Sequence, residues 1–546
     1  MRRDSAWVCS ISSQQALHNF RTTVGMYSAL EGGYDTMQKM GGWESPDCDL
    51  RGHAVGHLLS AYALLYAATG DSLYLLKGDS VVQGIRACQR YIGTGYVSAF
   101  PEGLIDRNIQ GQSVWAPWYT LHKVMAGMIA QYRYCSSDTA LAVVRDFAQW
   151  AERKLSGIDN DTRRRMLRNE FGGMPEVWLD LYHLTGDSIG CRLADFFYDN
   201  AKLDPLYTGD FRVGTMHANT FLPKVIAETK KDNQDSRRMA SAFFAEMQSH
   251  HVMAPGILSD KEHFFQPGTM AHHLSAYTGE TCCTYNMLRL AHRLYSFSTD
   301  ARYMLYIEQA LVNDILGQQD PESGMVHYFL PMQTGAYKLY STPMNSFWCC
   351  VGSSFESHAK YGENIYWYAG DTVFVNLWIP STLTWAEKGL RLRLETGFPR
   401  SDNATLVVEQ APKRTVTLML RRDSDYTVIH RRLRPGERIT VRREMKLHTV
   451  AAEGDSSRVA LFYGPILLAG RLGHVEHPFS DPTKHNDYYT YNYNVPDSIR
   501  EMTLNVQDIT PVEGQFAEFV TKDGVRISPL YDIHHERYVV YWKMRR

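Results

Sequence analysis

The stretch "HAVGHLLSAYALLYAATGD" at residues 53–71 decides how the first part of the chain folds. Its apolar residues recur every three to four positions, which predicts an α-helix. The closing Thr-Gly-Asp supplies a glycine that suits the end of this helix and an aspartate that suits the start of the next. A related ending, "HLTGD", returns at 183–187. The sequence therefore predicts a repeated unit of helix, short turn and helix.

The repeated unit extends from about residue 13 to about residue 360, with Gly, Asp or Pro between helical blocks of roughly 12 to 18 residues. A closed ring of helical hairpins, called an (α/α) barrel, and an open solenoid both fit such a repeat. The long Gly- and Pro-rich insertion at 96–120 favours the barrel, because solenoid repeats keep a more regular length. We therefore predict an (α/α)-barrel domain over residues 1–360.

After about residue 361 the period of the apolar residues changes to two. This alternation predicts β-strands, and the turn residues between the runs are typical of an antiparallel β-sandwich. We expect the sandwich domain to span residues 361–470, and a C-terminal β-rich segment, residues 471–546, to complete or extend it. The predicted fold class is thus mainly α with β. The clearest runs are 371–385, 389–398, 404–410, 414–422 and 437–450.

The composition restricts the partners of the protein. The 546 residues include 57 Lys and Arg against 59 Asp and Glu, and no run of 18 apolar residues occurs. We therefore predict neither nucleic acid nor a membrane as a partner, and a neutral ligand fits best. The 33 Tyr and 11 Trp suit sugar rings, although a tyrosine-rich core accounts for most of them equally well.

The amino end, "MRRDSAWVCSISSQQ", is basic but has no apolar segment, so no signal peptide is predicted. We leave the compartment unassigned. Free thiols are easiest to maintain in a reducing cytosol, and export would require a longer amino end. The sequence does not indicate the oligomeric state.

Two vicinal cysteine pairs indicate a metal site. Nine cysteines scattered over the chain do not form the dense, even pattern of a disulfide scaffold. In an extended segment, Glu280 and Cys282 would point to one face. Together with Cys349 and Cys350 they would supply three thiolates and one carboxylate, a set that suits tetrahedral zinc. Two unrelated buried pairs would fit the pattern alone equally well.

Glu262 is a candidate proton donor. It precedes His-Phe-Phe, where desolvation would raise the pKa of a carboxyl group, although such a glutamate is more often a surface or helix-start residue. A proton donor beside thiolates is suited to splitting a glycosidic bond. Histidines occur at three predicted helix starts, 51–57, 116–123 and 216–224. Any one of them would be explained by helix capping or core packing. Three at equivalent helix starts indicate a binding pocket.

Several stretches resemble glycoside hydrolase family 127, the β-L-arabinofuranosidase family, whose close relative is family 146. The resemblance runs in order from about Asn19 to the closing stretch at 529–542. Its most unusual elements are Glu-Thr-Cys at 280–282 and the later Trp-Cys-Cys-Val-Gly at 348–352. The stretches that carry it are 41–71, "WAPWYTLHKVMAG" (115–127), "EFGGMPEVWLDLYHLTGD" (170–187), "HANTFLPKV" (217–225), "EHF" (262–264), "GETCCTYNMLRL" (279–290) and "FWCCVGSSFESHAKYGENIYW" (347–367).

The resemblance implies an (α/α)6 barrel followed by β-sandwich domains. It also implies a retaining hydrolase that releases terminal L-arabinofuranose from β-L-arabinofuranosides, with an arabinose-containing oligosaccharide or glycoconjugate as substrate. The implied nucleophile is Cys349 and the implied acid/base is Glu262. The implied zinc ligands are Glu280, Cys282, Cys349 and Cys350, and the implied sugar-contacting residues are His122, His217 and Tyr328.

Three features depart from the family pattern: Cys283 doubles the expected cysteine, Pro175 replaces another residue, and the amino end is shorter. The doubling leaves open whether Cys282 or Cys283 is the ligand, and the i, i+2 spacing from Glu280 favours Cys282. The residues alone also permit two other functions. One is an (α/α)-barrel lyase, epimerase or hydrolase of other specificity with a structural zinc, and the other is a non-catalytic glycan-binding protein.

Overall fold

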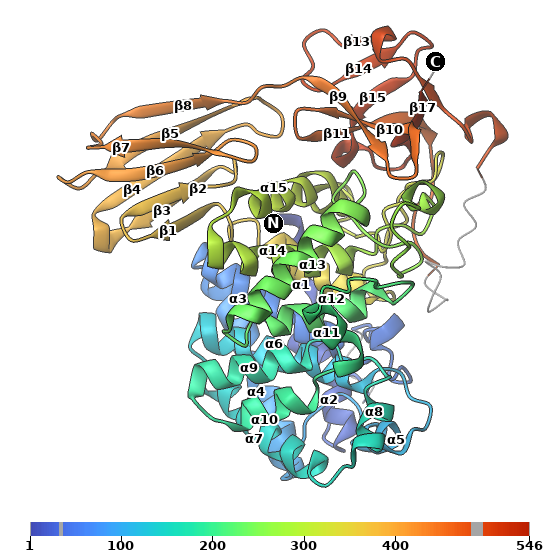
Figure 1. Ribbon diagram of the computed structural model, residues 1–546. Helices are drawn as coiled ribbons and strands as arrows, with labels where there is room; N and C mark the ends of the chain where they lie inside the picture. The colour runs from blue at the N-terminus through green and yellow to red at the C-terminus, as the bar shows by residue number, and fades with distance from the viewer. Residues whose placement is uncertain (1, 32–36, 482–494, 545–546) are drawn as a thin grey trace.

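Helices form the chain up to Ala359 and strands follow from Tyr366 in the computed structural model, which describes residues 2–31, 37–481 and 495–544 (Figure 1). Six of the described helices form a closed ring, because each packs against the next and the last packs against the first. This ring confirms the predicted helical barrel. Its inner helices are α3 (His53–Thr69), α6 (Pro117–Cys135), α9 (Met174–Thr185), α12 (Ala218–Glu228), α14 (Thr281–Ser298) and α17 (Cys349–Ala359).

The turn between α3 and the next helix has the predicted capping. Gly70 has a φ of 71°, a left-handed conformation that glycine adopts without strain. The carboxylate of Asp71 accepts a hydrogen bond of 2.9 Å from the backbone N–H of Leu73. Gly186 and Asp187 repeat this arrangement after α9. The Thr-Gly-Asp signal in the sequence therefore marks two junctions between an inner and an outer helix.

Outer helices return the chain between successive inner helices, so the inner helices all begin at the same end of the barrel. We call this end the N-terminal rim. The short helices α5 (Gly103–Gln110), α8 (Asn160–Met166) and α11 (Asn200–Tyr207) lie in the connections that lead to it. The outer helices are α2 (Ser13–Thr23), α4 (Ser72–Ile92), α7 (Asp138–Leu155), α10 (Ile189–Phe196), α13 (Gln234–His250) and α15 (Ala301–Ala310), which leads into α16 (Leu316–Gln318).

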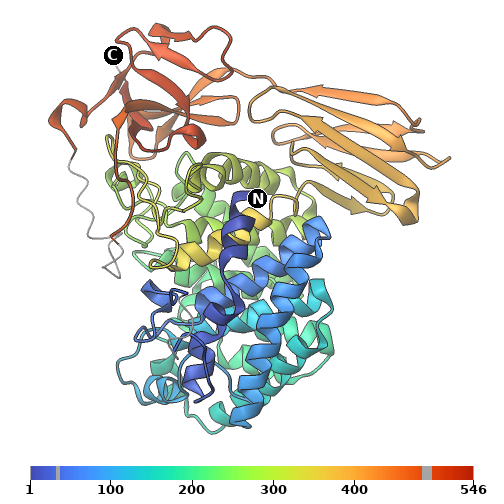
Figure 2. The same cartoon turned by 180° about the vertical axis from the view of Figure 1, so that it is seen from behind.

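The amino-terminal helix covers the last inner helix. Figure 2 shows α1 (Arg2–Ser10, dark blue) lying against α17 (yellow). The rings of Trp7 and Phe355 meet edge to face, with 4.9 Å between their centroids. This contact buries the outer side of the helix that carries the second cysteine pair.

Two four-stranded sheets follow the barrel and form the predicted sandwich (Figure 1). Leucines and valines from both sheets, among them Leu392, Leu406 and Leu418, belong to one buried apolar cluster. The neighbours β2 and β6 run parallel. The first sheet has the order β1 (Tyr366–Ala369), β2 (Thr372–Val375), β6 (Val416–Arg421), β7 (Tyr426–Arg431), and the second the order β3 (Ser381–Trp385), β4 (Leu390–Thr396), β5 (Asn403–Gln410), β8 (Arg438–Arg442).

The remaining strands form a separate nine-stranded sheet. It includes β10 and β11, which pair with each other and with C-terminal strands rather than with the sandwich. We therefore propose that the sandwich ends near Arg442, upstream of residue 470 where the apolar pattern placed its end. The strands are β9 (Leu447–Ala452), β10 (Asp455–Tyr463), β11 (Ile466–His474), β12 (Thr503–Leu504), β13 (Ile509–Pro511), β14 (Phe519–Thr521), β15 (Arg526–Pro529), β16 (Glu536–Val539) and β17 (Tyr541–Met544).

A buried ion cluster ties the sandwich to the barrel. Glu308, on the outer helix α15, forms ion pairs with Arg421 of β6 at 2.8 Å and with Arg443 at 2.6 Å. Burial alone would raise the pKa of Glu308, but the two guanidinium groups hold it below its ordinary value. Because each charge in the cluster has a partner, the orientation of the sandwich on the barrel is fixed by paired groups.

Within the described ranges, no helix combines the length and the hydropathy that crossing a membrane requires.

Candidate active site and metal centre

Four potential ligands meet where two inner helices begin. Glu280 is the residue just before α14 and Cys282 lies in its first turn, while Cys349 and Cys350 are the first two residues of α17. The two helices are neighbours in the ring. Cys282 therefore reaches the site from a helical turn, and not from the extended segment that the i, i+2 spacing implied. The two positive helix ends favour anionic ligands at this point.

The dimensions of this cluster fit a tetrahedral ion. One ligand atom from each of the four residues lies within 4.8 Å of all the others. The sulfur of Cys349 is 4.0 Å from the sulfur of Cys350 and 3.7 Å from Oε1 of Glu280. Bonds of about 2.3 Å from a tetrahedral metal to sulfur would place neighbouring sulfurs about 3.8 Å apart. The four residues, all buried, could hold a metal ion with little movement.

Cys282 differs from the other two thiols of the cluster in the direction of its pKa shift. Burial would raise the pKa of Cys282, but hydrogen bonds from Cys349, Cys350 and Ser353 hold it well below its ordinary value. Burial and the nearby charge of Cys282 raise the pKa of both Cys349 and Cys350. These shifts favour a negative charge on the buried thiol of Cys282. A buried negative charge is a typical environment for a bound cation.

Cys283 lies on the other side of the carboxylate. Its sulfur donates to Oε2 of Glu280 over 3.6 Å, whereas Oε1 of Glu280 faces Cys349. Burial and the charge of Glu280 raise the pKa of Cys283 well above its ordinary value, which keeps its proton in place. Cys283 therefore orients a ligand through a hydrogen bond, and the geometry favours Cys282 as the cysteine of the cluster.

The adjacent pair Cys282 and Cys283 offers a matched test of this arrangement. We expect Cys282→Ser to weaken metal binding at least about 100-fold, because it removes a soft ligand, and Cys283→Ser to weaken it less than about tenfold, because serine keeps a donor. Competition with a chromophoric chelator measures both affinities. The reverse order would show that Cys283 is the ligand.

A tyrosine connects the cluster to the predicted proton donor. The hydroxyl of Tyr328 donates a hydrogen bond of 2.5 Å to Oε1 of Glu262, and the sulfur of Cys349 lies 3.5 Å from the same hydroxyl oxygen. The Glu262 carboxylate is thus within about 6 Å of the sulfur, close to the separation of roughly 5–5.5 Å between the two catalytic groups of retaining glycosidases.

His217 holds the other oxygen of the same carboxylate. Its Nε2 lies 3.5 Å from Oε2 of Glu262, and it directly precedes the inner helix α12. Burial would lower the pKa of His217, but the carboxylates of Glu262 and Glu170 raise it above its ordinary value. Glu262 itself has a φ of 69°, which is uncommon for a non-glycine residue and directs its side chain from a constrained turn. The structure thus brings Glu262, His217, Tyr328 and the four-residue cluster together.

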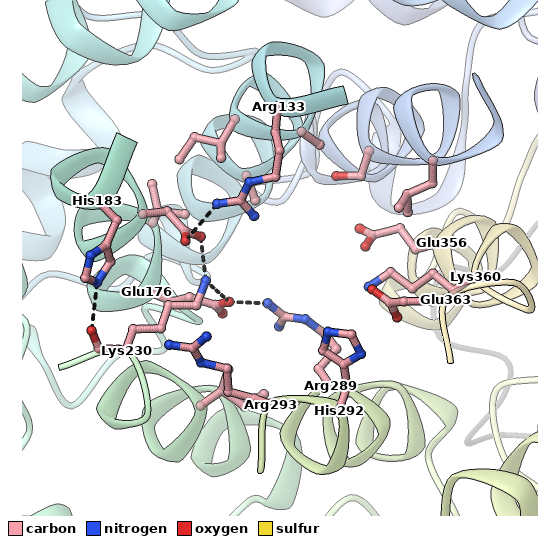
Figure 3. A pocket seen from close by; sticks show the side chains of 18 of the residues that line it. Arg133, Glu176, His183, Lys230, Arg289, His292, Arg293, Glu356, Lys360 and Glu363 are labelled. Atoms are coloured by element: carbon pink, nitrogen blue, oxygen red, sulfur yellow. Dashed lines mark hydrogen bonds and ion pairs between the residues drawn. The ribbon is translucent and has the colours of Figure 1, made fainter. Parts of the chain in front are cut away.

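His122 does not belong to this group and lines a cavity inside the barrel. Its Nδ1 accepts a hydrogen bond of 3.1 Å from the backbone N–H of Gly173, and it lines a cavity of about 710 Å³ bounded by all six inner helices. Figure 3 shows how ionic side chains of this cavity pair with one another: Lys230 and Arg289 both bind Glu176. Lys230 also pairs with Asp180. The predicted contact of His122 with sugar remains a prediction.

Lys123 and Ser353 interact with the cluster, although the sequence did not single them out. Lys123 is buried and packs over the rings of Tyr119 and Tyr285. Its positive charge contributes to the low pKa of Cys282. The hydroxyl of Ser353 and the sulfur of Cys282 share a hydrogen bond of 3.2 Å. Lys123 directly follows His122 inside an apolar helix, and a lysine in such a place is the signal that would have pointed to it.

Comparisons with known proteins agree with this architecture. A family model described as "Beta-L-arabinofuranosidase, GH127 catalytic domain" matches residues 1–363, and a model of the GH127 middle domain matches residues 372–424. No curated protein matches the sequence.

Solved structures resemble the whole chain. A GH127 β-L-arabinofuranosidase from Geobacillus stearothermophilus T6 superposes with a TM-score of 0.72 at 15% identity, covering 97% of this chain and 94% of that one. Another structure, described as a GH127 β-arabinofuranosidase, gives a TM-score of 0.71 at 15% identity over 100% of this chain and 95% of its own. At these identities the similarity shows a shared fold.

Proposed function

The chain belongs to glycoside hydrolase family 127 and is a glycosidase, and we propose that it is a retaining β-L-arabinofuranosidase with a cysteine nucleophile. The observation that carries this proposal is the linkage of Cys349 through the hydroxyl of Tyr328 to Glu262, which brings the sulfur and the carboxylate within about 6 Å of each other and so supports a double-displacement mechanism. The proposed substrate is a terminal L-arabinofuranose on an oligosaccharide or glycoconjugate.

We propose zinc as the metal of the cluster, held by Glu280, Cys282, Cys349 and Cys350. Three thiolates with one carboxylate form a donor set that zinc prefers. Its chemical contribution when bound would be to keep the thiols deprotonated near neutral pH, where a free alkyl thiol is mostly protonated. Burial and the charge of Cys282 raise the pKa of Cys349, which supports a need for such help.

The residues of the chain then perform two displacements. In the first, the sulfur of Cys349 attacks the anomeric carbon while Glu262 gives its proton to the departing oxygen, which leaves a thioglycosyl enzyme and a free alcohol. In the second, Glu262 takes a proton from water, the water oxygen attacks the same carbon, and the carbon–sulfur bond breaks. Two inversions return the sugar with its original configuration.

Tyr328 and His217 hold the acid/base in place between these steps. Both contact the Glu262 carboxylate, one at each oxygen. A positively charged His217 favours the carboxylate form, so it assists the first step, in which Glu262 gives its proton to the departing oxygen. We propose that both side chains also bind hydroxyl groups of the sugar.

The test is hydrolysis of 4-nitrophenyl β-L-arabinofuranoside by the wild-type protein, with metal content measured on the same sample. We expect turnover, close to one zinc per chain, and the β-anomer as the first product in a proton NMR time course. An α-anomer formed first would overturn the retaining mechanism. Absence of turnover with zinc bound would favour an (α/α)-barrel enzyme of other specificity and a structural metal.

A further inference from the structure

A basic pocket lies at the N-terminal rim between α8 and α11. It has a volume of about 520 Å³. These two short helices stand in the connections that lead into the inner helices α9 and α12 (Figure 1). We call this pocket the basic rim pocket. Its charged lining consists of Arg163, Arg164, Arg165, Arg168 and Lys202, with the carboxylates of Asp161 and Asp199.

The lining is strongly positive although the protein is not. Five cations and two carboxylates give the basic rim pocket a net charge of +3, whereas the whole chain has a net charge of −2. The balanced total, which suggested a neutral partner, thus hides a local excess of positive charge. A concave site with one sign of charge attracts ligands of the opposite sign.

The carboxylates in the pocket are already neutralised. Asp161 pairs with Arg164. Asp199 lies 3.7 Å from Lys202 and 3.9 Å from the buried amine of Lys224, whose pKa burial lowers to about 7. The lining carboxylates therefore do not compensate the remaining arginines.

The arginines of the basic rim pocket differ in whether their side chains already bind other parts of the protein. Arg163 donates to the backbone oxygen of Phe196, the last residue of α10, and to that of Tyr198 just beyond it, and so has a structural task. Arg168 is exposed, and among the interactions of the described residues none engages its guanidinium group. Arg168 thus remains as a donor for a ligand, and Lys202 on α11, whose ion pair with Asp199 is long at 3.7 Å, is the second candidate donor.

The pocket adjoins the candidate active site through one short segment. Two residues after Arg168, the carboxylate of Glu170 interacts electrostatically with His217 and Cys282. The next residue, Phe171, stacks under the ammonium of Lys224, 3.3 Å from its ring centre. A chain advances at most about 3.5 Å per residue, so Arg168 lies within roughly two residue lengths of a group that faces the catalytic residues.

We propose that the basic rim pocket binds carboxylate groups of an acidic glycan that carries the arabinofuranoside, so that the sugar released is neutral and the chain left behind is anionic. This inference rests on the proposed function. Arginine suits it because its planar guanidinium binds a carboxylate through two hydrogen bonds. The nearby rim then selects substrates by their charge, while the cluster and Glu262 perform the chemistry on an uncharged ring.

The experiment measures binding of an α-1,4-linked galacturonic acid tetramer by calorimetry at low ionic strength. The variants are Arg168→Gln with Lys202→Gln, and Arg432→Gln as a matched control, because Arg432 is an exposed arginine after β7 of the distant sandwich. We expect the double variant to bind the tetramer about tenfold more weakly than wild type and the control to bind it equally well. Thermal unfolding confirms that each variant is folded.

Three results would overturn the proposal. These are equal binding by wild type and the double variant, equal binding of a neutral cellotetraose, and binding of inorganic tripolyphosphate as tight as that of the galacturonate tetramer. The last would reveal a general anion site. Hydrolysis of the neutral 4-nitrophenyl glycoside, measured alongside, separates a failure of this inference from a failure of the proposed function, since that substrate carries no carboxylate.

Discussion

Cys349→Ser is expected to lower kcat/KM on 4-nitrophenyl β-L-arabinofuranoside by at least about 10⁴-fold, the scale on which removal of a nucleophile acts. A serine hydroxyl stays protonated in a place that already raises the pKa of a thiol. The control is Cys191→Ser on the outer helix α10, which removes a half-buried thiol away from the rim. We expect that control to keep its activity within about twofold.

Metal loss could mimic the loss of a nucleophile, so a second measurement isolates the covalent role. Rapid quenching of wild type with an activated 2-fluoro arabinofuranoside should leave a sugar adduct on the peptide that contains Cys349, visible by mass spectrometry. An adduct on a different residue would contradict the assignment. So would a metal-loaded Cys349→Ser protein that keeps more than about one per cent of the activity.

Glu262→Gln should lower kcat/KM by about 10²–10⁴-fold on a natural-type alkyl glycoside, because glutamine cannot protonate the leaving oxygen. With a 2,4-dinitrophenyl leaving group the first displacement needs no proton, so the loss in kcat/KM should be much smaller. The comparison of the two substrates is therefore the measurement. Glu102→Gln, at a rim carboxylate that pairs with Lys154, is the matched control.

An equal loss on both substrates would contradict the acid role of Glu262 and would indicate a purely structural task. In the expected case the second displacement becomes rate-limiting for the dinitrophenyl substrate, because the base that activates water is gone. A burst of dinitrophenol, followed by slow turnover, would mark this step.

The barrel could be predicted from the sequence because its signals are local. The three-to-four periodicity and the Thr-Gly-Asp junctions act within one or two helical turns, and Gly70 with Asp71 has the expected capping. The sheet to which β10 and β11 belong could not be predicted from the sequence. An alternating strand pattern shows that a strand forms but not which strand it pairs with, since pairing depends on chain segments that are distant in sequence.

Unusual residues predict one part of the candidate site, and the resemblance to the family predicts another part. Neighbouring cysteines and a Glu-x-Cys are visible in any sequence, yet their meeting depends on the packing of α14 against α17. The electrostatic effect of Lys123 on Cys282, the bridge made by Tyr328 and the inward position of His122 depend on the closure of the ring in the same way. No spacing rule along the chain encodes which side of a barrel helix faces a given neighbour.

The two halves of the cluster are far apart in the chain, and this has a consequence for biosynthesis. Cys282 and Cys350 belong to the fifth and the last inner helix, so a ribosome must release almost the whole barrel before the ligand set is complete. An ion that binds there fastens α17 to α14 from within the rim, while His57 and Glu356 join α17 to α3 at 2.6 Å. If zinc binds there, as we propose, its loading would follow the packing of α17 against α14 and would be one of the last steps in the maturation of the protein.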